Sequence, residues 1–329
     1  MSSSGAHVNA ARYRLVDLLS IAYMGVVGAA VLVERDHIDG WGLPAAIHIG
    51  FVALAFALIH LAARYPAQKA LGIARVFYPG AAFLLGYGEL DRLHALIFDH
   101  DWATSYLVRA DVAIFGTHPT VWVQQWYGSW ADELISLCYL SYYVLGLSIC
   151  VPWIARGHKE QVFAAGAIAA LTYYINYTLF YVMPAQGPRF LPELANLHTT
   201  QFHGPAFATL CRDLMGDAGA VKGGCFPSSH VSGAVAWSLA CMRYGWPTQT
   251  RIISVLSVGL TIGTVYLGYH HGVDPLGGLI MGVLGYGLSV WWLKARDEDP
   301  PPCPAWDEGR ERVSERRPRH SDEFPIAAE

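Results

Sequence analysis

Two histidines and a carboxylate stand at positions that could carry out chemistry on phosphorus. His270 precedes Asp274 by four residues, and His230 lies earlier in the chain. A carboxylate bonded to one imidazole nitrogen holds the other nitrogen deprotonated and directed at a substrate. His270 is therefore the candidate nucleophile, and Asp274 is the residue that orients it. His230 is then placed to protonate a leaving oxygen and later to activate an acceptor, as general acid and base in turn.

The residues around His230 predict a helix start that could bind an anion. Ser228 and Ser229 follow Pro227 and directly precede an apolar run, so they predict an N-cap with His230 in the first helical turn. The free amides and the positive dipole end of a helix N-terminus suit a phosphate group, and serine hydroxyls add donors. We expect Ser228 and Ser229 to contact the phosphate of a substrate.

A second helix start and an arginine complete the predicted site. Asp274 is followed by Pro275, and aspartate is a favoured N-cap while proline suits the first helical position. The sequence therefore predicts that Asp274 caps the last apolar helix. Arg189, in the segment Gly187-Pro188-Arg189, can hold phosphate oxygens with two parallel hydrogen bonds.

The composition of the chain indicates that its solvent is a lipid bilayer. Of 329 residues, 53% are hydrophobic and 15% are charged, against about 25% charged in soluble domains. The formal net charge is -4 and no basic run interleaves with aromatic residues, which excludes nucleic acid as a partner. The six cysteines form no CxxC pair and have no metal-ligand spacing with histidine, so a structural zinc site is not supported.

The apolar stretches predict an all-α, polytopic membrane helical bundle of about eight spans. A span needs about 20 apolar residues, and eight stretches approach that length. They are residues 15–33, 45–63, 70–88, 134–154, 162–183, 231–246, 252–269 and 275–293. Arg75 and Pro79 weaken the third stretch, and the sixth is short, with Arg243 near one end. Gly278 and Gly282 form a GxxxG pattern on the last span, which predicts close helix packing.

These spans divide the chain into five segments. They are a polar N-terminal segment (1–14), N-terminal transmembrane helices (15–90), an interfacial amphipathic segment (91–130), the catalytic transmembrane core (131–294) and a disordered cytoplasmic tail (295–329). The interfacial assignment rests on charges mixed with tryptophans such as Trp122 and Trp126, because indole rings favour the membrane–water boundary. The tail is rich in proline and mixed charge, which cannot bury enough apolar surface to fold alone.

Lysine and arginine in the predicted connections set the orientation of the bundle. One side of the membrane receives Arg12, Arg14, Arg64, Lys69, Arg156, Lys159, Arg243, Arg251, Lys294 and Arg296. The other side receives Arg35, Arg92, Arg109, Arg189, Arg212 and Lys222. The first side, which holds both termini, is cytoplasmic by this rule. The catalytic residues then face away from the cytoplasm.

The combination of motifs resembles the type 2 phosphatidic acid phosphatase superfamily, whose signature joins a Pro-Ser-Gly-His segment to a distant His-x-x-x-Asp. This chain has Pro227-Ser228-Ser229-His230 and His270-His271-Gly272-Val273-Asp274, with Ser229 in place of the usual glycine. The segments Tyr266-Leu267-Gly268-Tyr269-His270 and Gly187-Pro188-Arg189 strengthen the match, which covers residues 102–293. The resemblance implies a six-helix membrane core with interfacial helices and a site that faces away from the cytoplasm. It also implies a phosphohistidine at the nucleophile named above.

Two departures separate the chain from the phosphatase branch of that superfamily. That branch carries an arginine six residues before the nucleophile and a lysine seven residues before the first-motif arginine, where this chain has Thr264 and Val182. Absence of the arginine resembles inositol phosphorylceramide synthases and sphingomyelin synthases, which move a phospho-headgroup from a phosphodiester lipid to an alcohol. A monoester phosphate carries close to two negative charges and a diester one, so fewer cations suit the diester. Lys222 could compensate as a further phosphate-binding cation.

The sequence thus predicts an inositol phosphorylceramide synthase-like phosphotransferase that acts on a phospholipid or sphingolipid in the bilayer, with no cofactor and no metal. One alternative is a lipid phosphate phosphatase with water as the acceptor. Another, from a different class, is a lipid transporter or flippase that binds a headgroup without covalent chemistry. A metal site made of His230, His270, His271 and Asp274 is also conceivable. The oligomeric state does not follow from the sequence.

Two cysteines could form a disulfide next to the predicted site. Cys211 and Cys225 both lie in the long outward connection, where an oxidising compartment would permit a bridge. Such a bridge would brace the loop that leads to Ser228. The alternative is a pair of free thiols.

Overall fold

The structure, a computed structural model, describes residues 12–93, 97–98, 100–216, 221 and 223–304. Its long helices are α1 (Leu15–Val33), α2 (Gly42–Arg64), α3 (Lys69–Gly88), α7 (Ser129–Leu140), α8 (Tyr142–Ala155), α9 (Lys159–Val182), α12 (Ser229–Tyr244), α13 (Pro247–Tyr266) and α14 (Val273–Ala295). The connections contain η1 (Arg35–His37), α4 (Leu90–Leu93), α5 (Thr104–Phe115), α6 (Pro119–Trp122), η2 (Val123–Trp126), η3 (Pro188–Phe190), α10 (Pro192–Ala195) and α11 (Phe207–Gly216). The predicted all-α membrane bundle is confirmed.

All eight stretches predicted as spans are helical, but not all are long and apolar enough to cross a membrane alone. In the part of the chain that the structure describes, five helices meet that criterion: α1, α2, α3, α9 and α14. The pair α7 and α8 makes a sixth span if the two are counted together, because they meet at a bend of 51°. The single span predicted over 134–154 is thus broken at Ser141, whose hydroxyl donates to the Cys138 carbonyl at 2.6 Å. Such back-bonding competes with the helix ladder and bends helices.

The centre of the bundle is α12, which packs against α14, α13 and α9. It has 16 residues, short of the ~20 that a span needs, and its neighbours bury most of its side chains. A Cβ at Gly278 would lie 2.7 Å from the Ser228 carbonyl oxygen, and one at Gly282 would lie 2.8 Å from that of Ser232. The predicted close packing at these glycines is confirmed. It places the starts of α12 and α14 side by side.

The N-terminal helices α1, α2 and α3 pack together, and α1 and α3 also pack on α9. Inside this group Arg75 of α3 donates to Asp17 Oδ1 of α1 at 2.6 Å, and the Tyr78 hydroxyl donates to the same oxygen at 2.6 Å. Both charged side chains are buried, and their pairing explains how α3 keeps an arginine within a span. The outer face of α2 exposes apolar side chains to lipid: Leu43, Ile49, Leu54, Phe56 and Leu61.

The segment predicted to lie at the membrane interface consists of short helices in its described part. It contains α4, α5, α6 and η2, none of which is long enough to cross a bilayer. Trp122 is 53% exposed and Trp126 is 60% exposed. These exposed indoles agree with an interfacial position, which stays a prediction.

The residues that follow α14 do not belong to a disordered tail, contrary to the prediction for 295–329. Over residues 296–304 the chain packs on the starts and ends of neighbouring helices. The Glu298 carboxylate accepts a hydrogen bond from the Leu15 backbone at 2.7 Å, and Asp299 accepts one from the Arg243 guanidinium at 3.0 Å. Polar partners from other helices therefore hold a stretch whose composition alone indicates disorder. The rest of the tail, like most of the predicted N-terminal segment, lies outside the described residues.

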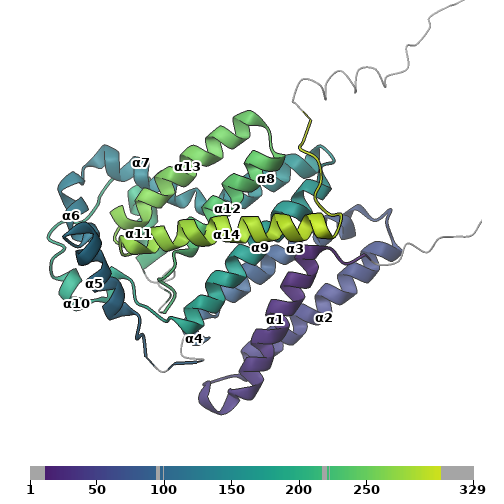
Figure 1. Cartoon of the computed structure of the whole chain (residues 1–329), viewed down its shortest axis with the longest axis horizontal. Helices are drawn as coiled ribbons and strands as arrows, with labels where there is room; N and C mark the ends of the chain where they lie inside the picture. The colour runs from purple at the N-terminus through teal and green to yellow at the C-terminus, as the bar shows by residue number, and fades with distance from the viewer. Residues whose placement is uncertain (1–11, 94–96, 99, 217–220, 222, 305–329) are drawn as a thin grey trace, which may run out of the picture.

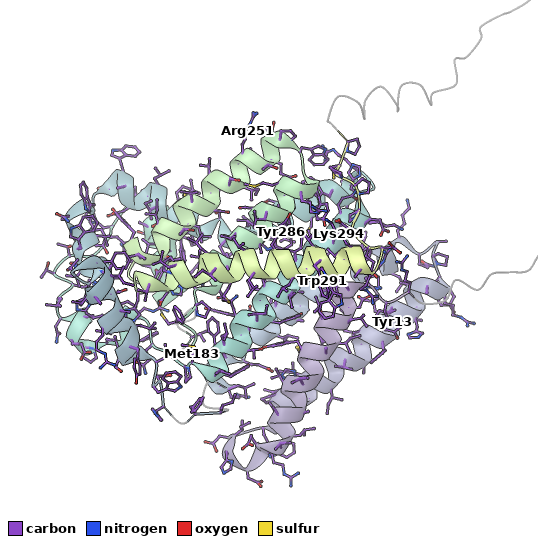
Figure 2. The ribbon with its side chains drawn as sticks, in the orientation of Figure 1. Tyr13, Met183, Arg251, Tyr286, Trp291 and Lys294 are labelled. Carbon is purple, nitrogen blue, oxygen red and sulfur yellow. The ribbon has the colours of Figure 1, made fainter. Side chains whose placement is uncertain are left out.

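The candidate site and the described chain ends lie at opposite ends of α14. Asp274 is the second residue of α14, whereas Glu298, which contacts the start of α1, follows its last residue. A helix of 23 residues is about 34 Å long, close to the ~30 Å hydrocarbon thickness of a bilayer. Figure 1 shows α14 across the view, with α11 near its first residues and the start of α1 near its last. Figure 2 places Lys294 and Tyr13 toward that second end and Met183 toward the first.

Candidate active site

His270 and Asp274 form the hydrogen-bonded pair that the sequence predicts. His270 lies in the turn between α13 and α14, where its backbone N–H donates to the Thr264 carbonyl at 2.9 Å. Its Nδ1 is 3.1 Å from Asp274 Oδ2, and both side chains are buried. The other nitrogen, Nε2, lies 3.2 Å from Ser228 Oγ. Because the carboxylate occupies Nδ1, Nε2 is the nitrogen left for chemistry.

Asp274 does not cap α14, so this prediction is wrong. It is the second residue of the helix, and its Oδ2 accepts a hydrogen bond from the His271 backbone at 2.8 Å. The start of the helix is capped instead by Asp111 of α5. That carboxylate accepts hydrogen bonds from the backbones of Gly272 and Val273 at 3.0 and 2.9 Å. A cap supplied by a distant helix leaves no local sequence signal, and it leaves the Asp274 carboxylate to pair with His270.

His271, next to His270, is fully buried and contacts two other segments of the chain. Its Nε2 lies 3.1 Å from the Gln186 carbonyl, and its Nδ1 lies 3.7 Å from Asp111 Oδ2. The Gln186 backbone in turn donates to Thr104 Oγ1 of α5 at 3.0 Å. His271 therefore holds the loop after α9 and helix α5 against the turn that contains His270.

Ser228 caps α12 as predicted, and its hydroxyl also contacts His270. The hydroxyl accepts a hydrogen bond from the Val231 backbone at 3.4 Å, while the Ser228 backbone donates to the Asp274 carbonyl at 3.2 Å. The Ser228 hydroxyl thus lies beside His270 Nε2 at the start of α12, and a helix start can stabilise a phosphate oxygen. Ser229 is the buried first residue of α12, and its contact with phosphate stays a prediction.

His230 lies close to His270 and is surrounded by tyrosines. The two imidazole centroids are 5.8 Å apart, with an angle of 67° between the rings. Tyr142 approaches His230 with a centroid distance of 4.5 Å, and Tyr139 stacks on it with its hydroxyl 3.3 Å from Nε2. His230 Nδ1 is buried without a hydrogen-bond partner among the described residues. The contact of His230 with a substrate oxygen stays a prediction.

Arg189 lies beside the turn that contains His270. Its guanidinium carbon is 4.9 Å from the centroid of the Tyr269 ring, and its Nη1 donates to the Met215 carbonyl at 2.8 Å. Gly187 allows this close approach, because a Cβ there would lie 2.7 Å from the Tyr269 carbonyl oxygen. The binding of Arg189 to phosphate stays a prediction. Lys222, the second predicted cation, lies outside the described residues.

Cys211 and Cys225 do not form the disulfide that the sequence suggests, because both are free thiols with separate partners. Cys211 Sγ lies 3.6 Å from the Tyr269 hydroxyl, whereas Cys225 Sγ donates to Asp274 Oδ2 at 2.8 Å. Burial raises the pKa of the Cys225 thiol well above its ordinary value, and the Asp274 carboxylate raises it further. The thiol therefore keeps its proton and serves as a hydrogen-bond donor to the Asp274 carboxylate.

One group of three side chains among the described residues could hold a metal ion. Cys225 Sγ, His270 Nδ1 and Asp274 Oδ2 lie within 4.8 Å of one another. A thiolate ligand would require Cys225 to lose its proton, which burial and the neighbouring carboxylate oppose. Hydrogen bonds among the three groups already account for this arrangement. We therefore assign no metal to them, and His230 and His271 do not belong to this group of three.

The contact between Cys225 and Asp274 makes a testable prediction. We expect Cys225→Ala to lower any activity that depends on the His270–Asp274 pair about tenfold, because a hydrogen bond to a charged group contributes about 1.5–3 kcal/mol and part of it orients the carboxylate. Cys225→Ser keeps a donor and should stay within about threefold of wild type. Steady-state assays in detergent micelles measure both, with Cys241→Ala, toward the other end of α12, as a buried control. Equal losses in the alanine and serine variants would contradict a hydrogen-bonding role.

The fold and the site together define a helical membrane protein whose buried His–Asp pair and second histidine meet at the starts of two helices. This arrangement suits nucleophilic attack on phosphorus. The PAP2 superfamily model matches residues 105–288, which is more than half of the chain. The chain belongs to the PAP2 superfamily.

One curated relative and the solved structures complete the comparison. A PA-phosphatase related-family protein from Dictyostelium discoideum is 25% identical over 192 residues, or 52% of this chain. The match covers 34% of that protein, so this chain spans about a third of the length of the curated relative. No solved structure matches the chain significantly.

Proposed function

We propose that this protein is a membrane enzyme that cleaves a lipid phosphoester through a phosphohistidine at His270 and passes the phospho-headgroup to an alcohol. The observation that carries the proposal is the site geometry. His270 Nδ1 is held by Asp274 at 3.1 Å, which leaves Nε2 beside Ser228, and the second imidazole is 5.8 Å away between centroids. Both imidazoles are therefore within reach of one phosphoryl group. Membership of the PAP2 superfamily independently supports a phosphatase-type enzyme.

In the first step His270 Nε2 attacks phosphorus, a P–N bond forms and the bond from phosphorus to the lipid oxygen breaks. His230 gives its proton to that leaving oxygen, and the diacylglycerol or its equivalent departs as an alcohol. Asp274 stabilises the positive charge that develops on the nucleophilic imidazole. Arg189 and the start of α12 stabilise the negative charge that builds up on the phosphoryl oxygens.

In the second step the acceptor oxygen attacks the phosphohistidine from the space that the leaving group vacated. The neutral His230 takes the acceptor proton, a P–O bond forms and the P–N bond breaks. The product carries the phospho-headgroup, and both histidines return to their starting protonation states. Water in place of the alcohol would make the same site a lipid phosphatase.

The distribution of charge around the site supports transfer from a diester over hydrolysis of a monoester. Thr264, where the phosphatase branch has arginine, is fully buried and uses its carbonyl to hold the backbone of the nucleophile turn. Val182, where that branch has lysine, is an apolar residue at the end of α9. A site with fewer cations suits a phosphate of one negative charge better than one with nearly two.

The proposed site faces away from the cytoplasm, with both termini on the cytoplasmic side. Cations such as Arg14, Lys159 and Lys294 lie at the starts of α1 and α9 and at the end of α14. The positive-inside rule places that end of the bundle in the cytoplasm. The lipid headgroup would then be exchanged at the opposite surface.

A product assay with the purified full-length protein tests the proposal. The protein is incubated with labelled phosphatidylinositol or labelled phosphatidic acid, each with and without ceramide or a polyol as acceptor. We expect consumption of the diester to depend on the acceptor and to yield a product that carries both headgroup and acceptor. Strong preference for phosphatidic acid with release of inorganic phosphate would contradict transfer and support the hydrolase.

A further inference from the structure

An apolar groove leads from His230 into the membrane-spanning part of the bundle. Its volume is about 570 Å³, and its lining comes mainly from α3, α8, α9 and α12. Ala81 and Leu84 of α3, with Tyr143 and Leu147 of α8, line it and are exposed. Exposed apolar side chains in this region face lipid, so the groove opens sideways to the bilayer between α3 and α8.

The polarity of the lining falls with distance from His230. Nearest to this histidine are Tyr142 and Tyr87, whose ring centroids lie 4.5 and 6.4 Å from that of the imidazole. Farther along, the lining is hydrocarbon: Val16, Val76, Phe77, Val162 and Phe163. A membrane lipid has the same order, with its phosphate and polar linkages at one end and its chains beyond.

The groove is long enough for an extended hydrocarbon chain. On α3 the lining runs from Tyr87 to Val76 and on α9 from Tyr177 to Val162, distances of about 16 and 22 Å at 1.5 Å per helical residue. One leaflet contributes about 15 Å of hydrocarbon, half the thickness of the core. A chain that starts at the site would therefore lie within the groove over at least the depth of one leaflet.

Charged groups close the far end of the groove. The guanidinium carbons of Arg75 and Arg14 lie 5.3 and 5.4 Å from the centroid of the Phe163 ring, which lines the groove. Arg75 is paired with the buried Asp17. A hydrocarbon chain that reached past Phe163 would separate these charged groups from their polar partners. A buried charge without a partner costs free energy, so longer chains are disfavoured.

We infer that this groove holds one acyl chain of the lipid whose phosphate lies between His230 and His270, and that its charged end limits the length of that chain. The inference rests on the proposed function for the position of the phosphate. The outer wall of the groove, α3, lies outside the part of the chain that matches the PAP2 superfamily model. The N-terminal helices thus add a chain-binding wall to the catalytic core.

A glycine in the groove provides a sharp test. Gly80 of α3 lines the groove, and a Cβ at this position would have no heavy atom within 4 Å, so a large side chain can enter without moving the backbone. Gly72, on the same helix and equally open, does not line the groove and is the matched control. We expect Gly80→Phe to lower kcat/KM for dioleoyl phosphatidylinositol about tenfold or more, because the chain is displaced and the phosphate misplaced. Dioctanoyl phosphatidylinositol should change by less than about twofold, and Gly72→Phe should leave both unchanged.

A second measurement separates this inference from the proposed reaction. Wild type and Gly80→Phe are irradiated in bicelles with phosphatidylinositol that carries a diazirine in mid-chain, and labelled peptides are mapped. We expect labelling of the groove floor, including the buried Trp237, that falls several-fold in Gly80→Phe and not in Gly72→Phe. Labelling of the groove floor without turnover would support binding of the acyl chain in the groove and contradict the proposed function. Equal effects of Gly80→Phe on both chain lengths, or labelling confined to outer faces such as that of α2, would overturn the inference.

Discussion

Replacing His270 with alanine should reduce turnover of the lipid phosphoester by about 10⁴-fold or more, since loss of a nucleophile leaves only the contribution of binding and charge stabilisation. The side chain is buried, hydrogen-bonded to Asp274 and directed at Ser228 through its free nitrogen. No other described side chain holds the same position between the two helix starts. Steady-state rates with labelled lipid measure the loss.

Two controls make the His270→Ala result specific. His60→Ala removes an exposed histidine of α2 whose Nδ1 contacts the Phe56 carbonyl of its own helix, and it should keep wild-type activity. Thermal unfolding in detergent shows whether His270→Ala still folds. His270→Ala also distinguishes an enzyme from a transporter, because in an enzyme this variant loses turnover but keeps lipid binding. Wild-type turnover in the folded variant would end the nucleophile assignment.

The second large effect is expected at His230. Loss of general acid–base catalysis costs about 10²–10⁴-fold, so His230→Asn should lower turnover of the natural lipid by that range. The expected loss depends on the leaving group. A nitrophenyl phosphoester releases a stable anion that needs no proton, and its kcat/KM should fall by less than about tenfold.

The comparison of leaving groups distinguishes proton transfer from simple positioning. With the nitrophenyl substrate the first step stays fast in His230→Asn, while the second step still lacks its base. We therefore expect a burst of nitrophenolate followed by slow turnover. Equal losses for the lipid and the nitrophenyl ester, without a burst, would contradict the acid–base role and indicate that the ring only packs against Tyr139 and Tyr142.

The fold follows from local sequence signals to a large extent. Each stretch of apolar residues forms a helix, and the serine before α12 caps it, because span length and N-cap chemistry depend on neighbouring residues only. The convergence of His230 and His270 was also predictable. Two predicted spans, which form α12 and α13, separate them, so they return to the same end of the bundle, and Gly278 with Gly282 brings α12 and α14 close.

The predictions that the structure contradicts concern contacts between segments far apart in the chain. Asp111 of α5 caps α14 and leaves Asp274 to pair with His270, which no local spacing could indicate. Cys225 pairs with that carboxylate and not with Cys211, because the fold buries it beside an acceptor. The ordered residues after α14 depend in the same way on Arg243 of a separate helix. Such partners are set by tertiary packing, which a single sequence does not reveal.

Trapping the covalent intermediate tests the proposed chemistry most directly. The protein is mixed with lipid carrying radioactive phosphorus, stopped with denaturant at alkaline pH, where phosphohistidine survives, and digested for peptide mapping. Label should appear on the peptide that contains His270 before product accumulates and should be absent from His270→Ala. Product formation without any protein-bound label, or label on a different residue, would show that the headgroup does not pass through this histidine.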